Sequence, residues 1–271
     1  MLRFKGGLQL NFKRISIVLL CSIALLGSAA KAFAAKSNKI SLTELQAAGL
    51  ISTGLKPLYP NYDSCLKVSS PFASSTRYDG SQRTSSSNHG YHGGMDISLK
   101  IGTPIIAVAD GMVVQVATGG RLVGNMIMLR HTPQDTGLKL WIFSKYQHLD
   151  QPSILKVGAN IKKGDMVGLG GRTGTTGGHF GTTGYPHLHM NIYANRSGKY
   201  KQGKGGKLHI HNKMYIDPLA IFFKTTLNSH ELRKMPQRQK TFPIPYMTTD
   251  GKLFPVDTRT VWPIACTKEN K

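Results

Sequence analysis

Residues 184–193 read GYPHLHMNIY, and this stretch alternates apolar and polar side chains. Leu188, Met190 and Ile192 are spaced by two, so in an extended strand they share one face. His187 and His189 then point together to the opposite face. Two imidazoles fixed side by side on a strand form half of a metal site, because metal ligands have to be held in position before the ion binds. A surface strand with two exposed histidines is the alternative interpretation of this stretch taken alone.

A second half of such a site lies upstream, where residues 91–97 read YHGGMDI. His92 and Asp96 are four residues apart and fall on one face of an extended backbone. The glycine pair between them disfavours a helix. An imidazole and a carboxylate on one face are suitable ligands for zinc.

The chain between the two histidine motifs is rich in predicted strands. Residues 103–109 form an apolar run, and residues 112–116 are expected to return beside it, because the Asp110-Gly111 pair is a hairpin signal. No long amphipathic helix is predicted.

Further strands are expected at residues 125–130, at 139–146 and after the turn within 157–167. The second of these runs into His148, which places a third candidate histidine at a strand end. Residues 168–184 are rich in glycine and threonine and predict a loop that leads into the stretch at 184–193.

Residues 1–34 have the pattern of a secretory signal peptide. The start is basic, the apolar run at 15–26 is too short to span a bilayer, and residues 32–34 (Ala-Phe-Ala) supply a cleavage site. An uncleaved membrane anchor is the alternative. We therefore expect an exported protein that resides in the periplasm or at the extracellular cell wall.

The chain is strongly basic, with a formal net charge of +22. Most of this charge lies outside residues 1–34, so the exported protein would still favour polyanionic partners. For an exported protein we expect these to be anionic cell-wall polymers or membrane surfaces, and no nucleic acid.

Two cysteines remain after residue 34, Cys65 and Cys266. One pair in an exported chain favours a structural disulfide that ties the C-terminal segment to the start of the main domain. Two free thiols are the alternative.

The order of these motifs resembles that of the lysostaphin-type (LytM-type) zinc metallopeptidases of bacterial cell walls. The match covers about residues 68–222 and includes His92-x-x-x-Asp96, the HxH stretch and the Asp217-Pro218 pair. Between them the matching segments are 102–104, 109–111, 125–131, 146–149, 163–165 and 174–189.

The resemblance implies that His92, Asp96 and His189 bind Zn²⁺, and that His148 and His187 are the catalytic pair. Two imidazoles and one carboxylate would leave the zinc centre at a net charge of about +1, still strong enough to activate water. The separate roles of the two catalytic histidines are left open.

Other histidines receive different interpretations. His131 matches a family position that we interpret as structural, and His209 and His211 form a second HxH that we expect to be exposed. Asn191 departs from the family, which commonly has an acidic residue at this position. The family's active-site tyrosine upstream of the first ligand has two candidates here, Tyr78 and Tyr91.

We therefore predict a mainly β protein, with an antiparallel sheet crossed by a substrate groove and extensions at both ends. The predicted organisation is a signal peptide (1–34), an N-terminal extension (35–64) that opens with a short helix capped at Ser41, a zinc metallopeptidase domain (65–225), and a C-terminal extension (226–271) lying over the surface.

The expected function is that of a zinc endopeptidase that hydrolyses peptide cross-links of peptidoglycan. The alternatives are a non-catalytic wall-binding or amidase-activating protein of the same fold, and a zinc carboxypeptidase acting on stem peptides. The sequence does not distinguish diaminopimelate-type cross-links from glycine bridges.

Overall fold

The structure is a computed structural model that describes residues 40–85, 87–175 and 184–268. The predicted signal peptide and the segment 176–183 of the glycine-rich loop lie outside the described residues. Residues Ile40–Lys271 form one compact unit. No helix of the described part is long and apolar enough to cross a membrane.

The helices and strands of the described residues are, in chain order, α1 (Leu42–Ala47), β1 (Lys56–Leu58), β2 (Asp63–Ser64), β3 (Val68–Ser70), η1 (Asn88–Gly90), β4 (Met95–Ser98), β5 (Pro104–Ile106), β6 (Gly111–Thr118), β7 (Asn125–His131), α2 (Pro133–Thr136), β8 (Trp141–Leu149), β9 (Asn160–Ile161), β10 (Met166–Leu169), β11 (His187–Asn195), β12 (Tyr200–Gln202), η3 (Lys204–Gly206), β13 (Leu208–Ile210), β14 (Met214–Ile216), α3 (Ala220–Phe223), α4 (Ser229–Lys234), η4 (Gln237–Gln239), β15 (Thr241–Pro243), β16 (Tyr246–Met247), β17 (Leu253–Phe254) and β18 (Thr267–Lys268).

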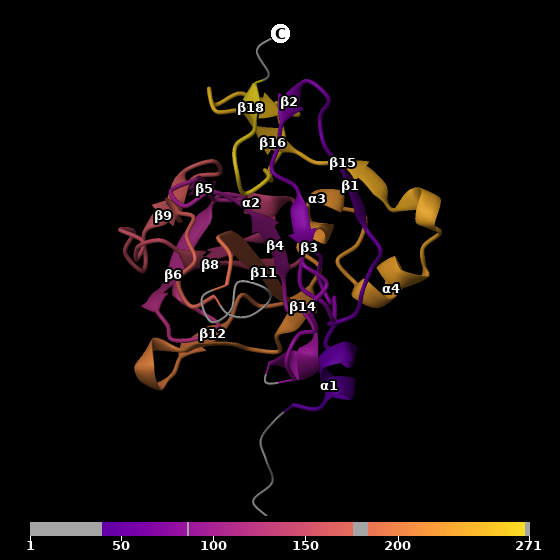
Figure 1. Ribbon diagram of the computed structural model, residues 1–271, viewed down its shortest axis with the longest axis vertical. Coiled ribbons are helices and arrows are strands. Elements are labelled where there is room, and N and C mark those ends of the chain that lie inside the picture. Colours follow the sequence, from indigo (N-terminus) through magenta and orange to yellow (C-terminus); the bar gives the residue numbers. More distant parts are fainter. Residues whose placement is uncertain (1–39, 86, 176–183, 269–271) are drawn as a thin grey trace, which may run out of the picture. The chain divides into compact units, whose positions relative to one another are not determined.

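The largest sheet has eight strands in the order β3-β4-β11-β8-β7-β6-β9, with β14 also paired to β11 (Figure 1). Neighbouring strands of this sheet run antiparallel. The prediction of a mainly β protein with an antiparallel sheet is therefore confirmed. Strand β11 lies between β4 and β8, so it joins the two halves of the predicted site.

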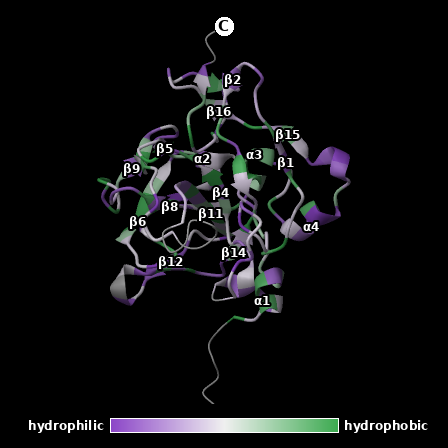
Figure 2. Cartoon of the chain, in the orientation of Figure 1, coloured by the Kyte–Doolittle hydropathy of each residue, from purple (hydrophilic) through white to green (hydrophobic). Residues whose placement is uncertain are grey.

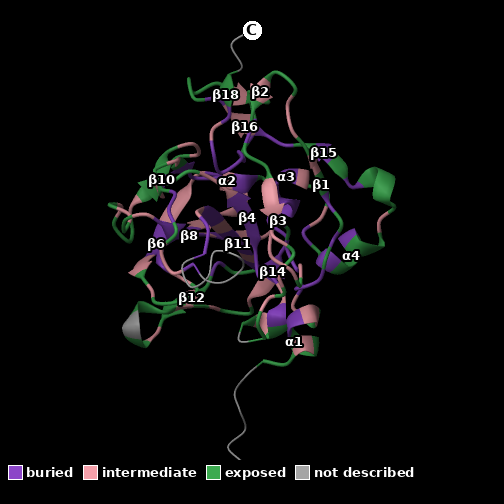
Figure 3. Ribbon diagram, in the orientation of Figure 1, coloured by how far each residue is buried: buried purple, intermediate pink, exposed green. Residues whose placement is uncertain are grey.

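The alternation predicted for β11 sets the two faces of the sheet. Leu188, Met190 and Ile192 are fully buried in the main hydrophobic core. The same core takes in helix α3 and residues from the opposite end of the chain, among them Trp262. Figure 3 shows β4, β8 and β11 as the buried centre of the molecule, and Figure 2 shows β6 as largely hydrophobic.

The other face of the sheet is covered only in part. Near the Trp141 end of β8, Phe143 packs in a smaller cluster with Tyr200 and Leu208, which belong to the β12–β13 hairpin. Beyond this cluster the same face carries the histidines of β11. The hairpin therefore leaves the part of the sheet that holds these histidines available as the floor of a groove.

The prediction of a β-hairpin at Asp110-Gly111 is wrong. Strand β5 pairs with β10 in a separate two-stranded sheet, whereas β6 pairs with β7 and β9. The Asp110 carboxylate accepts a hydrogen bond of 2.8 Å from the backbone N–H of Lys163, so it is tied to the turn before β10. A Cβ on Gly111 would lie 2.6 Å from the carbonyl oxygen of Arg130, so glycine is needed for close approach to β7. The Asp-Gly pair therefore connects β5, in the two-stranded sheet, to β6, in the large sheet.

The two terminal segments pack on each other as well as on the sheet. Strand β1 pairs in parallel with β15, and β2 pairs with β18. Helix α1 begins at the predicted capping box, in which Ser41 accepts from the backbone of Glu44. We expected residues 226–271 to lie over the surface, but Trp262 in this segment is fully buried. Its indole N–H donates to the carbonyl oxygen of Leu66 at 3.0 Å, so its polar group is satisfied inside the core. The boundaries of the predicted extensions stay a prediction.

The predicted disulfide is confirmed, because Cys65 and Cys266 are bonded with a Cα–Cα distance of 4.4 Å. The bond closes a loop with a sequence separation of 201 residues. In the chain-entropy model a loop of this length stabilises the folded state by up to about 5 kcal/mol.

Replacing Cys65 and Cys266 together by serine is expected to lower the free energy of unfolding by up to about 5 kcal/mol. Urea denaturation of variant and wild type measures this change, and reduced wild-type protein serves as the control. A loss below about 1 kcal/mol would show that contacts other than the bond hold the C-terminal segment in place.

Candidate metal centre

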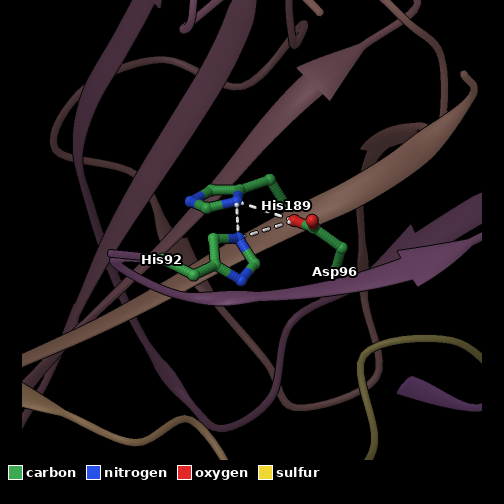
Figure 4. A group of neighbouring side chains, drawn as sticks. All are labelled: His92, Asp96 and His189. Atoms are coloured by element: carbon green, nitrogen blue, oxygen red, sulfur yellow. Dashed lines mark hydrogen bonds and ion pairs between the residues drawn. The ribbon is translucent and has the colours of Figure 1, made fainter. Parts of the chain in front are cut away.

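The predicted zinc ligands converge on the floor of the groove, where His92, Asp96 and His189 face one another (Figure 4). His92 Nε2 lies 3.0 Å from His189 Nδ1 and 3.0 Å from Asp96 Oδ1. His189 Nδ1 lies 2.8 Å from the same carboxylate oxygen. Three donor atoms from two separate motifs therefore form a nearly equilateral triangle.

The strands explain how this triangle forms. Asp96 on β4 is the direct cross-strand partner of His189 on β11, so their side chains share one face of the sheet. His92 precedes β4 and is buried, with its Nδ1 donating to the carbonyl oxygen of Pro71 at 2.9 Å. The close approach of this segment to β11 requires Gly94, because a Cβ there would lie 2.2 Å from the carbonyl oxygen of Met190.

The chemistry of the donor set fits a zinc ion. A carbonyl oxygen cannot donate, so His92 carries its proton on Nδ1 and turns a bare Nε2 toward the triangle. That nitrogen faces a carboxylate oxygen and a second imidazole nitrogen, so the donor atoms converge on a point where a cation can bind. Tetrahedral zinc with bonds of about 2.0–2.1 Å separates its ligands by about 3.3 Å, so the triangle has to open by only a few tenths of an ångström.

The electrostatics of the site keep Asp96 and His189 in the forms that bind a metal ion. Burial alone would raise the pKa of Asp96, but electrostatic interactions with the His92 and His187 imidazoles and hydrogen bonds from His189 and His92 hold it well below its ordinary value. Burial lowers the pKa of His189 to about 4, against the opposing influence of Asp96. A carboxylate and neutral imidazoles are the species that bind a metal ion.

His187 and His148, the predicted catalytic pair, lie beside the triangle. Their ring centroids are 4.7 Å apart, and His187 Nε2 lies 3.6 Å from Asp96 Oδ1. His187 Nδ1 donates to the carbonyl oxygen of Tyr185, and His148 Nδ1 donates to that of Thr173, each at 2.8 Å. Both rings are thereby fixed in the tautomer whose Nε2 accepts a proton.

A β-bulge places His148 in the groove. Gln147 pairs with Met126 and Leu149 with Asn125, so His148 is an extra residue between them on β8. Its φ of +64° lies in the left-handed region, which histidine enters more readily than most residues. Without the bulge, alternation would turn the side chain after Gln147 toward the core.

Arg83 is a site residue that the sequence analysis missed. Its Nη2 donates to Asp96 Oδ2 at 3.2 Å and to Ser70 Oγ at 2.8 Å, and its Nε donates to the carbonyl oxygen of Thr76. These contacts leave Oδ1 of Asp96 turned toward the two histidines. No motif could have revealed Arg83, because it comes from a polar loop without periodicity.

Replacing Arg83 by lysine is expected to weaken zinc binding about tenfold, because lysine keeps the charge but lacks the planar guanidinium that binds Asp96 while it is anchored on Ser70 and Thr76. Competition with a chromogenic chelator measures the zinc affinity, and Arg238→Lys at an exposed position is the matched control. An unchanged affinity would mean that Arg83 plays no part in orienting Asp96.

Tyr185 is the second residue that the sequence analysis did not assign. Its ring stacks on His187 with centroids 4.3 Å apart and an interplanar angle of 19°. Of the two tyrosine candidates upstream of the first ligand, Tyr91 lines the groove and Tyr78 contacts the Tyr185 ring with centroids 3.9 Å apart.

The three other histidines that the sequence analysis interpreted, His131, His209 and His211, lie outside the described lining of the groove. His131 is fully buried, and its ring nitrogens contact the Asp110 carbonyl oxygen and Ser144 Oγ. His209 and His211 are exposed. The groove itself has a volume of about 470 Å³ and is lined by all five predicted site residues.

Comparisons with known proteins agree with the predicted resemblance. Residues 90–202 match the model of Peptidase family M23. An uncharacterized metalloprotease of Haemophilus influenzae is 36% identical over 129 residues, which cover 48% of this chain and 23% of that protein.

Two further relatives have more specific names. The peptidoglycan DD-endopeptidase ShyC of Vibrio cholerae is 34% identical over 104 residues, covering 38% of this chain and 20% of ShyC. Lysostaphin of Staphylococcus simulans is 33% identical over 108 residues, covering 40% of this chain and 19% of lysostaphin. The chain thus spans about a quarter or less of the length of the relatives it matches.

Proposed function

We propose that this protein is a zinc-dependent endopeptidase that hydrolyses peptide cross-links of bacterial peptidoglycan. The observation that carries the proposal is the triangle of His92 Nε2, Asp96 Oδ1 and His189 Nδ1, with His148 and His187 beside it in one groove. The family M23 match and the names of ShyC and lysostaphin support peptidoglycan as the substrate.

The ligand set leaves one position of a tetrahedral ion open for water or substrate. A zinc ion held by these three residues would polarise the scissile carbonyl and make water nucleophilic near neutral pH. Three protein ligands with an open fourth position are typical of catalytic rather than structural zinc sites.

The chain's own residues supply the proton transfers. His148 and His187 present bare Nε2 atoms beside the triangle, so either can accept a proton from the attacking water and return it to the leaving amine. Burial lowers the pKa of both imidazoles, so both are neutral at physiological pH and ready to accept a proton. Tyr185 holds the His187 ring by stacking on it.

We also propose that the protein is exported and acts at the cell wall. The basic chain favours contact with anionic wall polymers or membrane surfaces. The Cys65–Cys266 bond supports this location, because disulfides persist in oxidising compartments.

A digest of purified sacculi by the zinc-loaded protein tests the function, with the muropeptides identified by mass spectrometry. An endopeptidase converts cross-linked dimers to monomers. Release of single terminal amino acids would identify a carboxypeptidase instead. Binding to sacculi without any change in the muropeptides would identify a wall-binding or amidase-activating protein.

A further inference from the structure

Lys145 places a positive charge on the floor of the groove next to the metal centre. On β8 and β11, Gln147 is the cross-strand partner of His189, and Lys145 is the partner of Asn191. The two pairs are neighbours on the same face of the sheet, separated by one two-residue step of about 7 Å along the strands. A peptide whose scissile bond lies at the triangle therefore passes within reach of the Lys145 side chain.

The ammonium of Lys145 has no counter-charge among the described residues. Asp96 is the only acidic residue in the described lining of the groove, and it is already engaged by Arg83 and the histidines. Within the described chain no hydrogen bond or ion pair reaches the Lys145 ammonium, although its side chain is largely buried. Its charged neighbour is another cation, Lys213, which lies over the Tyr193 ring.

Asn191 explains why this charge is unbalanced. An acidic side chain at this position would lie directly opposite Lys145 and pair with it. The neutral amide cannot do so, and its Oδ1 is buried without a hydrogen-bond partner among the described residues. This cross-strand pair therefore places a cation at the groove without a balancing anion opposite it.

An unpaired, largely buried ammonium is costly until an anion binds to it. This cost shows in the pKa of Lys145, which burial and the charge of Lys213 lower to about 8. At neutral pH most molecules still carry the charge. A bound carboxylate would compensate it and would be held by a charge-assisted hydrogen bond.

Resting on the proposed function, we infer that Lys145 is a specificity-determining residue that binds a free carboxylate of the substrate beside the scissile bond. The substrate class is then the diaminopimelate-type cross-link, in which the carbon that bears the cross-linking amine also carries a free carboxylate. A glycine bridge offers no side-chain anion at this place. The C-terminal carboxylate of a stem peptide is a second source of the same chemistry.

The test compares four soluble substrates with the zinc-loaded full chain. They are a diaminopimelate-linked muropeptide dimer, the same dimer with its diaminopimelate carboxylate amidated, the dimer with its C-terminal carboxylate amidated, and a glycine-bridged dimer. We expect kcat/KM for the first substrate to exceed that for the diaminopimelate amide by about 10- to 100-fold, with C-terminal amidation having little effect.

Lys145→Met should abolish this preference through KM, with kcat and bound zinc unchanged. Lys145→Arg should retain most of it, and Lys156→Met at an exposed position is the matched control. Equal cleavage of the free and amidated dimers by wild type, or a preference that survives Lys145→Met, would overturn the inference. An effect of C-terminal amidation alone would overturn the diaminopimelate assignment.

Binding separates this inference from the proposed function. The dissociation constants of the free and amidated dimers are measured on the zinc-loaded His148→Asn protein, with and without Lys145→Met, where turnover is slow. A preference for the free carboxylate that depends on Lys145 supports the inference even if wild type cleaves none of the substrates. No preference in binding contradicts it, whatever the protein cleaves.

Discussion

Replacement of His189 by alanine is expected to remove zinc binding and to reduce cross-link cleavage by at least about 10³-fold, because the metal's stabilisation of the transition state amounts to several kcal/mol. The loss should be this large because His189 Nδ1 contacts both of the other donor atoms, at 2.8 and 3.0 Å. Bound zinc is measured by elemental analysis, and cleavage by the appearance of monomeric muropeptides.

The chain supplies a matched control for this variant. His211→Ala alters the same residue of the second HxH sequence, which is exposed and lies outside the groove lining. It should retain both zinc and activity. Full zinc content and undiminished cleavage in His189→Ala would refute the assignment of the triangle as the metal centre.

Replacement of His148 by asparagine is expected to lower kcat by about 10²- to 10⁴-fold while zinc stays bound, because we propose that His148 transfers protons and because it lies outside the triangle. Asparagine is chosen because it tolerates the left-handed backbone conformation that His148 adopts at φ +64°. The exposed His209→Asn serves as the control. Loss of zinc together with activity would show that His148 is a ligand.

The pH dependence of kcat in the wild type is expected to follow the pKa of His148. Burial, followed by the charges of His187 and His189, lowers the pKa of His148 well below 6.5. A group with a lowered pKa stays neutral to lower pH, so kcat should change little as the pH falls from about 7.5 to about 6.5. A kcat that halves near pH 6.5 would show that the proton acceptor has an unperturbed pKa.

The main sheet and the faces on which the candidate ligands lie could be predicted because short-range patterns encode them. The spacing of Leu188, Met190 and Ile192 fixes which face of β11 is buried, and this places His187 and His189 on the other face. The order of the two motifs then made it possible to expect His92 and Asp96 beside them. Alternation alone gives the faces of β11, whereas the grouping of His92 and Asp96 with His189 came from the family resemblance.

Other features depend on contacts that no local pattern reports. The Asp110-Gly111 pair looks like a hairpin, but its partners are Lys163 and Arg130, far away in the sequence. The side-chain direction of His148 depends on a bulge against β7, which shifts the register by one residue. Sequence spacing alone would have turned this side chain into the core.

Arg83 and Lys145 were missed for a related reason. Arg83 acts on Asp96 from a loop, and only the folded chain shows that the two meet. Lys145 lies within a predicted strand, where a basic residue is usually solvated. Its importance comes from the absence of a counter-charge in the described groove, which depends on every residue that lines the site.

The most direct test of the proposed zinc hydrolysis is a titration of the metal-free protein with Zn²⁺, in which bound metal and cleavage of a cross-linked dimer are followed together. We expect no cleavage without metal, a rise in proportion to bound zinc, and saturation at one zinc per chain. Cleavage by the metal-free protein, or a zinc-saturated protein that leaves every cross-linked dimer intact, would contradict the proposed function.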